Sequence, residues 1–261
     1  MSTLSEPLVL NQRDARDVVT LTLNRPDSCN ALSQAMLGAL KTELDSLACD
    51  DSVRVVVLAA AGKAFCAGHD LKEMRATPSR AYYQGLFEQC NEVMLAIQHL
   101  SVPVIARVQG IATAAGCQLV AMCDLAVAAV TARFAVSGVN LGLFCATPSV
   151  ALSRNLSQKA AFEMLVTGEF ISADQALSKG LVNRVVPAAN LDAEVASLLD
   201  SIVSKPQLAL RLGKALFYRQ RDKGIHEAYA EAAQTMACNM MDESALEGVQ
   251  AFIEKRQPRW Q

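Results

Sequence analysis

The fold is decided by two stretches of sequence, VRVVVLAAAGKAFCAGHDLKEM at residues 53–74 and VPVIARVQGIATAAGCQLVAM at residues 102–122. Each begins with a nearly unbroken apolar run of strand length, which is typical of a strand buried on both faces of a parallel sheet. Each run is followed at once by a loop rich in small residues, at 61–74 and at 110–115. Because ligands bind outside the carboxyl ends of such strands, we expect the site at these two loops.

The segments on either side continue the alternation of strand and helix. Strands are expected at 18–23 and 125–129, and helices from Ser33 to about residue 49, at 79–99 and at about 115–122. This order predicts βαβ units around a largely parallel sheet, and hence an α/β fold. The last third reads as helices with one short strand at 182–186; the helices are expected at 157–167, 172–179, 191–204, 206–218, 225–241 and 243–255. We predict a core over residues 1–190 and a helical region over 191–261.

Composition and charge exclude several classes of protein. With 52% hydrophobic and 19% charged residues, the chain can bury a large core and has apolar surface left for neighbouring subunits. A formal net charge of −2 argues against a nucleic-acid partner. The uncharged segment 134–153 is interrupted by Gly and Pro, so we interpret it as a buried, irregular segment that lines a cavity, and we predict no membrane partner.

The cysteines and histidines do not form a metal-binding pattern. None of the 8 cysteines forms a Cys-x-x-Cys pair, and the 3 histidines lie far apart in sequence, so no metal site is predicted. Free thiols and the absence of a signal-like N-terminus predict a cytoplasmic protein. Cys66, Cys117 and Cys145 are expected to be buried small apolar residues, because no neighbouring base would activate them.

The chemistry is expected to come from backbone groups in the two loops. Ala67 and Gly68 let a ligand approach the backbone closely. The second loop leads into a helix, whose N-terminus presents unpaired N–H groups and the positive end of the helix dipole. Two converging N–H donors would form an oxyanion hole.

The spaced motifs of the chain resemble those of the crotonase (enoyl-CoA hydratase/isomerase) superfamily nearly from end to end. The matching motifs are Asn24-Arg25-Pro26, Asn30-Ala31-Leu32, Ala67–Lys72, Pro103–Ala106, Ala115-Gly116-Cys117, Cys123-Asp124, Thr167-Gly168, Gly180-Leu181-Val182, Val186-Pro187 and Ala251-Phe252 with Lys255-Arg256. Within the superfamily, the run Gly-Val-Asn-Leu-Gly-Leu-Phe-Cys at 138–145 is similar to one branch.

This resemblance implies a fold, a ligand and an assembly. The fold would be a spiral of ββα units with a C-terminal helical trimerisation region, assembled as a homotrimer or a dimer of trimers. The ligand would be an acyl-CoA thioester, with CoA present only as part of the substrate and no other cofactor. The oxyanion-hole N–H groups would belong to His69 and Ala115. The resemblance places CoA contacts at Ala31, Ala67, Gly68, Asp70, Leu71, Lys72 and Gly116, with Phe252 and Lys255 reaching the ligand from a neighbouring subunit.

Two positions depart from the hydratase pattern. The two glutamates that handle the water proton in hydratases of this family fall at Gln118 and Gly138. A carboxamide cannot take up a proton near neutral pH, and glycine has no side chain, so true hydration is expected to be weak. Gln118 and Asn140 are the polar groups expected to orient substrate or water. The alternatives are a barely catalytic acyl-CoA-binding protein and a His69-assisted decarboxylase or hydrolase of a CoA thioester.

Overall fold

The computed structural model describes residues 6–260 and is organised around a six-stranded sheet. The strands lie in the order β1-β2-β3-β4-β6-β9, with β1 antiparallel to β2 and the remaining neighbours parallel. Their bounds are β1 (Val9–Arg13), β2 (Val18–Leu23), β3 (Val55–Ala60), β4 (Val104–Val108), β6 (Leu125–Ala129) and β9 (Arg184–Val186). The predicted parallel α/β sheet is therefore confirmed.

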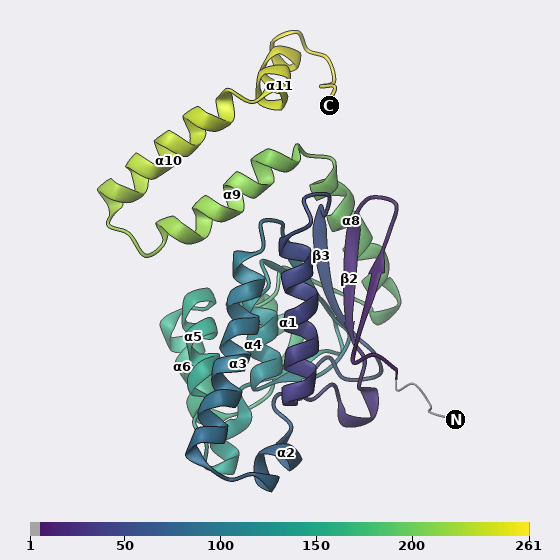
Figure 1. Ribbon diagram of the computed structural model, residues 1–261, viewed down its shortest axis with the longest axis vertical. Coiled ribbons are helices and arrows are strands. Elements are labelled where there is room, and N and C mark those ends of the chain that lie inside the picture. Colours follow the sequence, from purple (N-terminus) through teal and green to yellow (C-terminus); the bar gives the residue numbers. More distant parts are fainter. Residues whose placement is uncertain (1–5, 261) are drawn as a thin grey trace.

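Both faces of this sheet are covered, which explains the unbroken apolar runs. Along β3, Val56 and Leu58 pack into the larger core, whereas Val55 and Val57 belong to a second cluster on the opposite face. The larger core includes α1 (Gln34–Ala48) and α3 (Arg80–His99), and the second cluster is closed by α8 (Leu191–Val203). Figure 1 shows α1 and α3 on one side of the sheet and α8 on the other.

A small three-stranded sheet, β5-β7-β8, holds the second loop. Its strands are β5 (Ala112–Thr113), β7 (Arg133–Ala135) and β8 (Ile171–Ser172). β5 is parallel to β7 and leads directly into α4 (Ala115–Met122), in which residues 115–121 are all buried. The remaining helices of the core are α2 (Leu71–Ala76), α5 (Ala146–Asn155), α6 (Gln158–Thr167) and α7 (Ala173–Lys179), with 3₁₀ turns η1 (Pro26–Ser28), η2 (Ser137–Leu141) and η3 (Ala188–Asn190).

The chain ends in three helices, α9 (Gln207–Gln220), α10 (Ile225–Met240) and α11 (Glu243–Ile253), which we call the C-terminal arm. A buried ammonium anchors α9, because Lys214 Nζ donates to the carbonyls of Ile97 and Val102 and to Asp124 Oδ2. Asp124 also accepts hydrogen bonds from the Tyr218 hydroxyl and the Val104 N–H. Asp124 therefore has a structural role, since it ties α9 to the start of β4.

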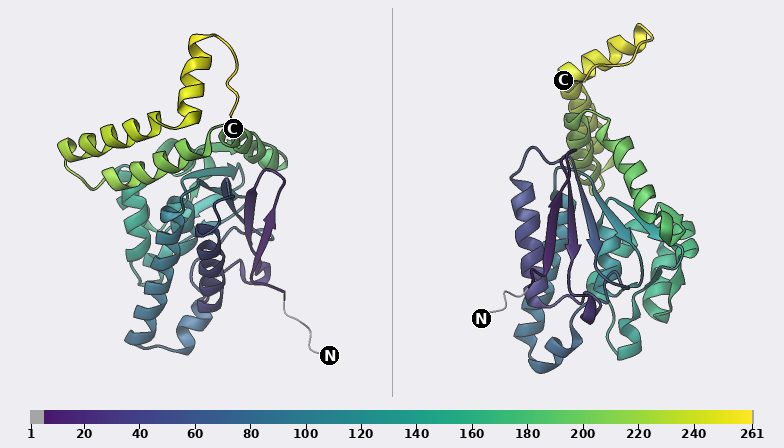
Figure 2. Two further views of the ribbon diagram at one scale, coloured as in Figure 1. Left: turned by 45° about the horizontal axis from the view of Figure 1, so that its top comes forward. Right: turned by 90° about the vertical axis from the view of Figure 1, so that its right-hand side faces the viewer.

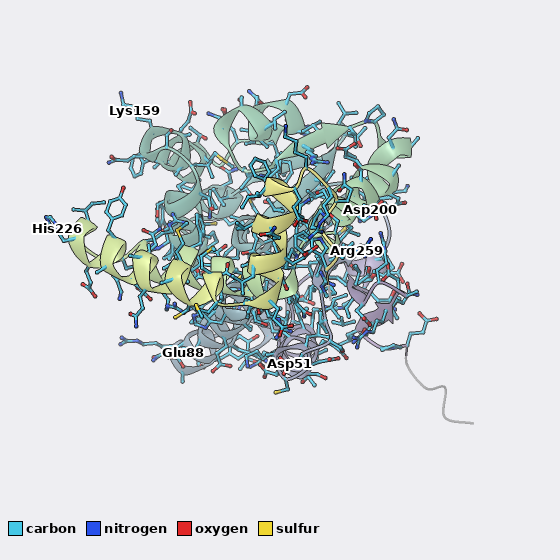
Figure 3. The ribbon with its side chains drawn as sticks, turned by 90° about the horizontal axis from the view of Figure 1, so that it is seen from above. Asp51, Glu88, Lys159, Asp200, His226 and Arg259 are labelled. Atoms are coloured by element: carbon cyan, nitrogen blue, oxygen red, sulfur yellow. The ribbon has the colours of Figure 1, made fainter. Side chains whose placement is uncertain are left out.

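The outer part of the arm extends away from the core. In the views of Figure 2, α10 and α11 project beyond the sheet and its covering helices, and from above His226 marks an end of α10 that overhangs the core (Figure 3). The arm exposes large apolar side chains, including Tyr229, Met236, Met241 and Phe252. The division into a core and a helical region at residue 190, and the trimer, stay predictions.

The sequence-based expectation for residues 134–153 was wrong in part. The segment contains the ordered helix α5, and Leu141, Leu143 and Phe144 are exposed rather than buried. Its polar interruptions are compatible with a helix, because Pro148 lies within the first turn of α5, where proline is tolerated. Within residues 6–260, no helix combines the length and apolar character needed to cross a bilayer.

Candidate active site

The two small-residue loops are joined backbone to backbone. The Cys66 N–H donates to the Ile111 carbonyl at 3.1 Å, and the Thr113 N–H donates to the Cys66 carbonyl at 3.0 Å. Gly116 makes this approach possible, since a Cβ at that position would lie 2.1 Å from the Cys66 oxygen. Any larger residue there would push the loops apart.

The two predicted N–H donors are both free of intramolecular acceptors. Leu32 bonds to the residues on either side of His69: its N–H donates to the Gly68 carbonyl, and its carbonyl accepts from Asp70. Ala115 is the first residue of α4, where a helix cannot supply an acceptor. Among residues 6–260, neither the His69 N–H nor the Ala115 N–H has an acceptor.

These donors lie close to one another. A Cβ built on Gly68, the residue before His69, would lie 3.3 Å from the Ala115 nitrogen. Both residues line one cavity of about 230 Å³. Its wall is formed by the loop after β3, α2, Phe87 of α3, the start of α4 and the segment 137–148. The wall is mostly apolar and contains no Asp, Glu, Lys or Arg; its polar side chains are His69, Ser137, Cys145 and Thr147.

The His69 ring has no hydrogen-bond partner. Its centroid lies 5.4 Å from that of Phe87 in an edge-to-face arrangement, and both ring nitrogens are buried without a partner within the described chain. Burial lowers the pKa of His69, and the nearby Leu32 carbonyl opposes this only in part. The ring is therefore neutral at neutral pH. It does not bind Asp70, which pairs with Arg25 at 2.7 Å instead.

Asp70 has a structural role at the edge of the site. Its carboxylate caps α2 by accepting from the N–H groups of Lys72 and Glu73. Burial raises the pKa of Asp70, but the hydrogen bonds from Arg25 and the α2 backbone outweigh it, and the pKa lies below the ordinary value. The charged form therefore holds the first loop against α2 and η1.

The two positions that depart from the hydratase pattern, Gln118 and Gly138, supply no acid–base group in the structure. Gln118 is only 3% exposed, sits one turn into α4, and its Oε1 has no partner among residues 6–260. Gly138 lines the cavity, and a Cβ there would lie 2.5 Å from the Leu143 carbonyl oxygen and 2.7 Å from Cys145 Sγ. The η2 turn is thus closed around a residue without a side chain.

The structure gives Asn140 a hydrogen bond within the fold. Its side-chain amide donates to the Gly168 carbonyl at 3.2 Å, and the residue is outside the cavity wall. A role for Asn140 in catalysis stays a prediction. Sequence reasoning missed the hydroxyl pair of Thr113 and Ser137. The two hydroxyl oxygens lie 3.0 Å apart, and Ser137 lines the cavity. The signal was weak, because each residue stands alone in its segment.

The thiols are as inert as expected. Burial raises the pKa of Cys66 and of Cys117 to about 12, and raises that of Cys145, which lines the cavity. A thiolate is therefore disfavoured at each of the three. Among residues 6–260, no group of three His, Cys, Asp or Glu side chains is arranged to hold a metal ion.

The predicted CoA contacts fall in two separate places. Ala67 and Leu71 line the cavity, Lys72 is exposed on α2, and Ala31 and Gly116 lie buried behind the loops. Phe252 and Lys255 lie at the end of the arm, and Phe252 is 85% exposed. Figure 1 places α11 at the opposite end of the molecule from α2, so one chain does not bring these two groups together.

Comparison with known proteins supplies the family. The sequence profile of the enoyl-CoA hydratase/isomerase family matches residues 13–261. The chain belongs to this family. Among solved structures it is similar to an enoyl-CoA hydratase from Mycobacterium smegmatis, with 69% identity, a TM-score of 0.97 and coverage of 98% of this chain and 99% of that one.

Two further relatives of this chain belong to the branch that the 138–145 motif suggested. Human enoyl-CoA hydratase domain-containing protein 3 is 43% identical, with a TM-score of 0.93 over 97% of this chain and 100% of that chain. The mitochondrial mouse protein of the same name is 44% identical over 98% of this chain and 85% of its own. The predicted family and the predicted likeness to this branch are confirmed, whereas the cytoplasmic location of this enoyl-CoA hydratase/isomerase family protein stays a prediction.

Proposed function

We propose that the protein binds an acyl-CoA thioester and stabilises negative charge on the thioester oxygen through the N–H groups of His69 and Ala115. The observation that carries this proposal is that His69 and Ala115, whose N–H groups lack acceptors, line one apolar cavity. A developing enolate oxygen placed there would accept two preorganised hydrogen bonds in a largely water-free site. Membership of the enoyl-CoA hydratase/isomerase family supports a thioester as the ligand.

The acyl group is expected to be uncharged. The cavity wall has no Lys or Arg, and burial disfavours the charged form of His69, so a carboxylate on the acyl chain would lose water without gaining a permanent cationic partner. This disfavours malonyl-type thioesters and with them the His69-assisted decarboxylase. It leaves aliphatic thioesters, which the leucine and phenylalanine side chains of the segment 141–144 would contact.

The reaction itself depends on groups that can exchange a proton. Neither Gln118 nor Gly138 can do so near neutral pH, and the thiols nearby are held protonated. The neutral His69 ring is the remaining titratable group in the cavity wall. We therefore propose a slow enzyme or an acyl-CoA-binding protein, with any proton transfer carried out by His69.

We also propose that the CoA moiety is completed by a second copy of the chain. Lys72 and Arg75 on α2 are exposed and basic, and suit the CoA phosphates. Phe252 and Lys255 would reach the ligand only from a neighbouring subunit, in a homotrimer or a dimer of trimers. The exposed apolar side chains of the C-terminal arm support such an assembly.

The oxyanion hole is tested by deleting one donor. Ala115→Pro removes the N–H at the first helical position, where proline is tolerated, and Gln158→Pro makes the same change at the start of α6, away from the cavity. We expect butyryl-CoA, measured by calorimetry, to bind the wild type and the Gln158→Pro variant alike and to lose at least about tenfold in affinity in Ala115→Pro. Equal affinity in all three proteins would overturn the proposed hole.

A further inference from the structure

Ala114 adopts a backbone conformation that normally requires glycine. Its angles are φ 51° and ψ −121°, which are those of the first central residue of a type II′ turn. Five non-glycine residues among those described have positive φ, and Ala114 is the one that lines the cavity. An L-residue with a Cβ is strained there, so the methyl group is present although a glycine would fit the backbone better.

The methyl group lies beside the two N–H donors. A Cβ built on Gly68 would lie 2.9 Å from the Ala114 Cβ and 3.3 Å from the Ala115 nitrogen. Ala114 directly precedes Ala115, and Gly68 directly precedes His69. The Ala114 methyl therefore occupies the rim of the hole, between the segments that carry the donors.

We infer that Ala114 is a specificity-determining residue that selects acyl chains unbranched at the carbon next to the thioester carbonyl. This inference rests on the proposed function. With the thioester oxygen held by the N–H groups of His69 and Ala115, the carbonyl carbon must sit within van der Waals distance of the rim. The sulfur on that carbon is the same in every CoA thioester, so the α-carbon is the neighbour that varies. An α-methyl branch would need the space that the Ala114 methyl fills.

The inference is tested with two isomeric ligands, butyryl-CoA and isobutyryl-CoA, which differ in α-branching but not in composition. Dissociation constants are measured by calorimetry for the wild type, Ala114→Gly and Ala146→Gly. Ala146 also lines the cavity but lies at the start of α5, so its truncation controls for added volume. We expect the wild type to prefer butyryl-CoA by about tenfold or more, as one misplaced methyl group can cause. Ala114→Gly should reduce this preference to about threefold or less by tightening isobutyryl-CoA, and Ala146→Gly should leave it unchanged.

The remaining outcomes distinguish a failure of this inference from a failure of the proposed function on which it rests. If the wild type binds both isomers equally, or if Ala114→Gly keeps the full preference, the inference is wrong while thioester binding stands. Failure of both isomers to bind the wild type would overturn the proposed function, and the inference with it. Ala114→Ser provides a second variant that keeps a side chain at the rim; its larger group should raise the preference for butyryl-CoA, and a lowered preference would contradict the assignment.

Discussion

The loop after β3 and the start of α4 bring two residues with acceptor-free N–H groups, His69 and Ala115, to one cavity. By contrast, Gly138 in the wall of that cavity and the buried Gln118 of α4 offer no group that exchanges a proton. The donors depend on backbone geometry, which small residues at 67, 68 and 114–116 preserve. Acid–base chemistry depends on side-chain identity, and positions 118 and 138 carry a carboxamide and a single hydrogen atom in place of two carboxylates. The proposed charge stabilisation and the proton transfer therefore depend on different features of the chain, and the four predictions below test them.

The largest effect is expected from restoring a carboxylate. Wild-type hydration of crotonyl-CoA should be very slow, because a general acid–base group typically contributes about 10²–10⁴-fold. Gln118→Glu should raise the rate by about 10²-fold or more, measured as loss of enoyl absorbance, and Gln118→Asn serves as the control without a titratable group. A wild-type rate ordinary for hydratases would contradict the prediction. In that case His69→Ala, which keeps the backbone N–H, should abolish activity.

The arrangement of the two N–H donors can be disrupted by a substitution at Gly116. The Cβ of Gly116→Ala would meet the Cys66 carbonyl, so the loops must separate and the N–H groups diverge. We expect butyryl-CoA binding to fall by at least about tenfold and stability by about 1–3 kcal/mol. Gly213→Ala, on α9 with nothing within 4 Å of the new methyl, is the matched control for both calorimetry and thermal melting. Binding that survives intact in Gly116→Ala would show that the loop spacing is unimportant.

The second missing carboxylate cannot be restored in the same way as the first. A Cβ at position 138 would collide with the Leu143 carbonyl and Cys145 Sγ, so a glutamate there would require η2 to move. Gly138→Glu should lower stability by about 1–3 kcal/mol, and adding it to Gln118→Glu should give no further hydration. Gly85→Ala, in open space on α3, is the control in thermal melting. A more active double variant would show that η2 rearranges.

The smallest effect concerns the pH dependence of stability. The pKa of His69 is lowered in the folded protein, so below its ordinary value of about 6.5 the unfolded chain binds a proton that the folded chain does not. Stability should therefore fall as the pH drops through this window, by at most about 1.4 kcal/mol per pH unit from this group. His69→Gln should lose this component in denaturant titrations between pH 7 and pH 5, with His226→Gln as the baseline. An unchanged slope in His69→Gln would mean that the ring is not held neutral by burial.

The strands and helices near the site could be predicted because their signals are local. Val55–Ala60 is buried on both faces and reads as an unbroken apolar run, and α4 follows a run of small residues. The short strands β5, β7 and β8 were not predicted, because two or three residues carry no periodicity and form only through pairing with distant segments. The helix α5 was missed because its polar residues and Pro148 interrupt the apolar periodicity by which a half-exposed helix is predicted.

The candidate site divides in the same way. The motifs on either side of His69 and Ala115 place them in the two loops, and the structure brings both to one cavity. Their role as donors stays a prediction. The conformation of Ala114 and the crowding at Gly138 depend on close approach between loops that are far apart in the chain, and no pattern in the sequence reports it. The lack of a hydrogen-bond partner for the His69 ring cannot be inferred from the sequence either. The carboxylate of Asp70 is adjacent to it in sequence, and only the structure shows that this carboxylate pairs with Arg25.

The two acceptor-free N–H groups also have a consequence for hydrogen exchange. Most buried amides exchange with solvent deuterium only when their helix or strand opens. The residues next to His69 and Ala115 are hydrogen-bonded, but the amides of His69 and Ala115 are not, so water that enters the cavity can exchange them while the fold stays closed. A ligand that occupies the cavity would then slow the exchange of these two amides, independently of any change in the global stability of the protein.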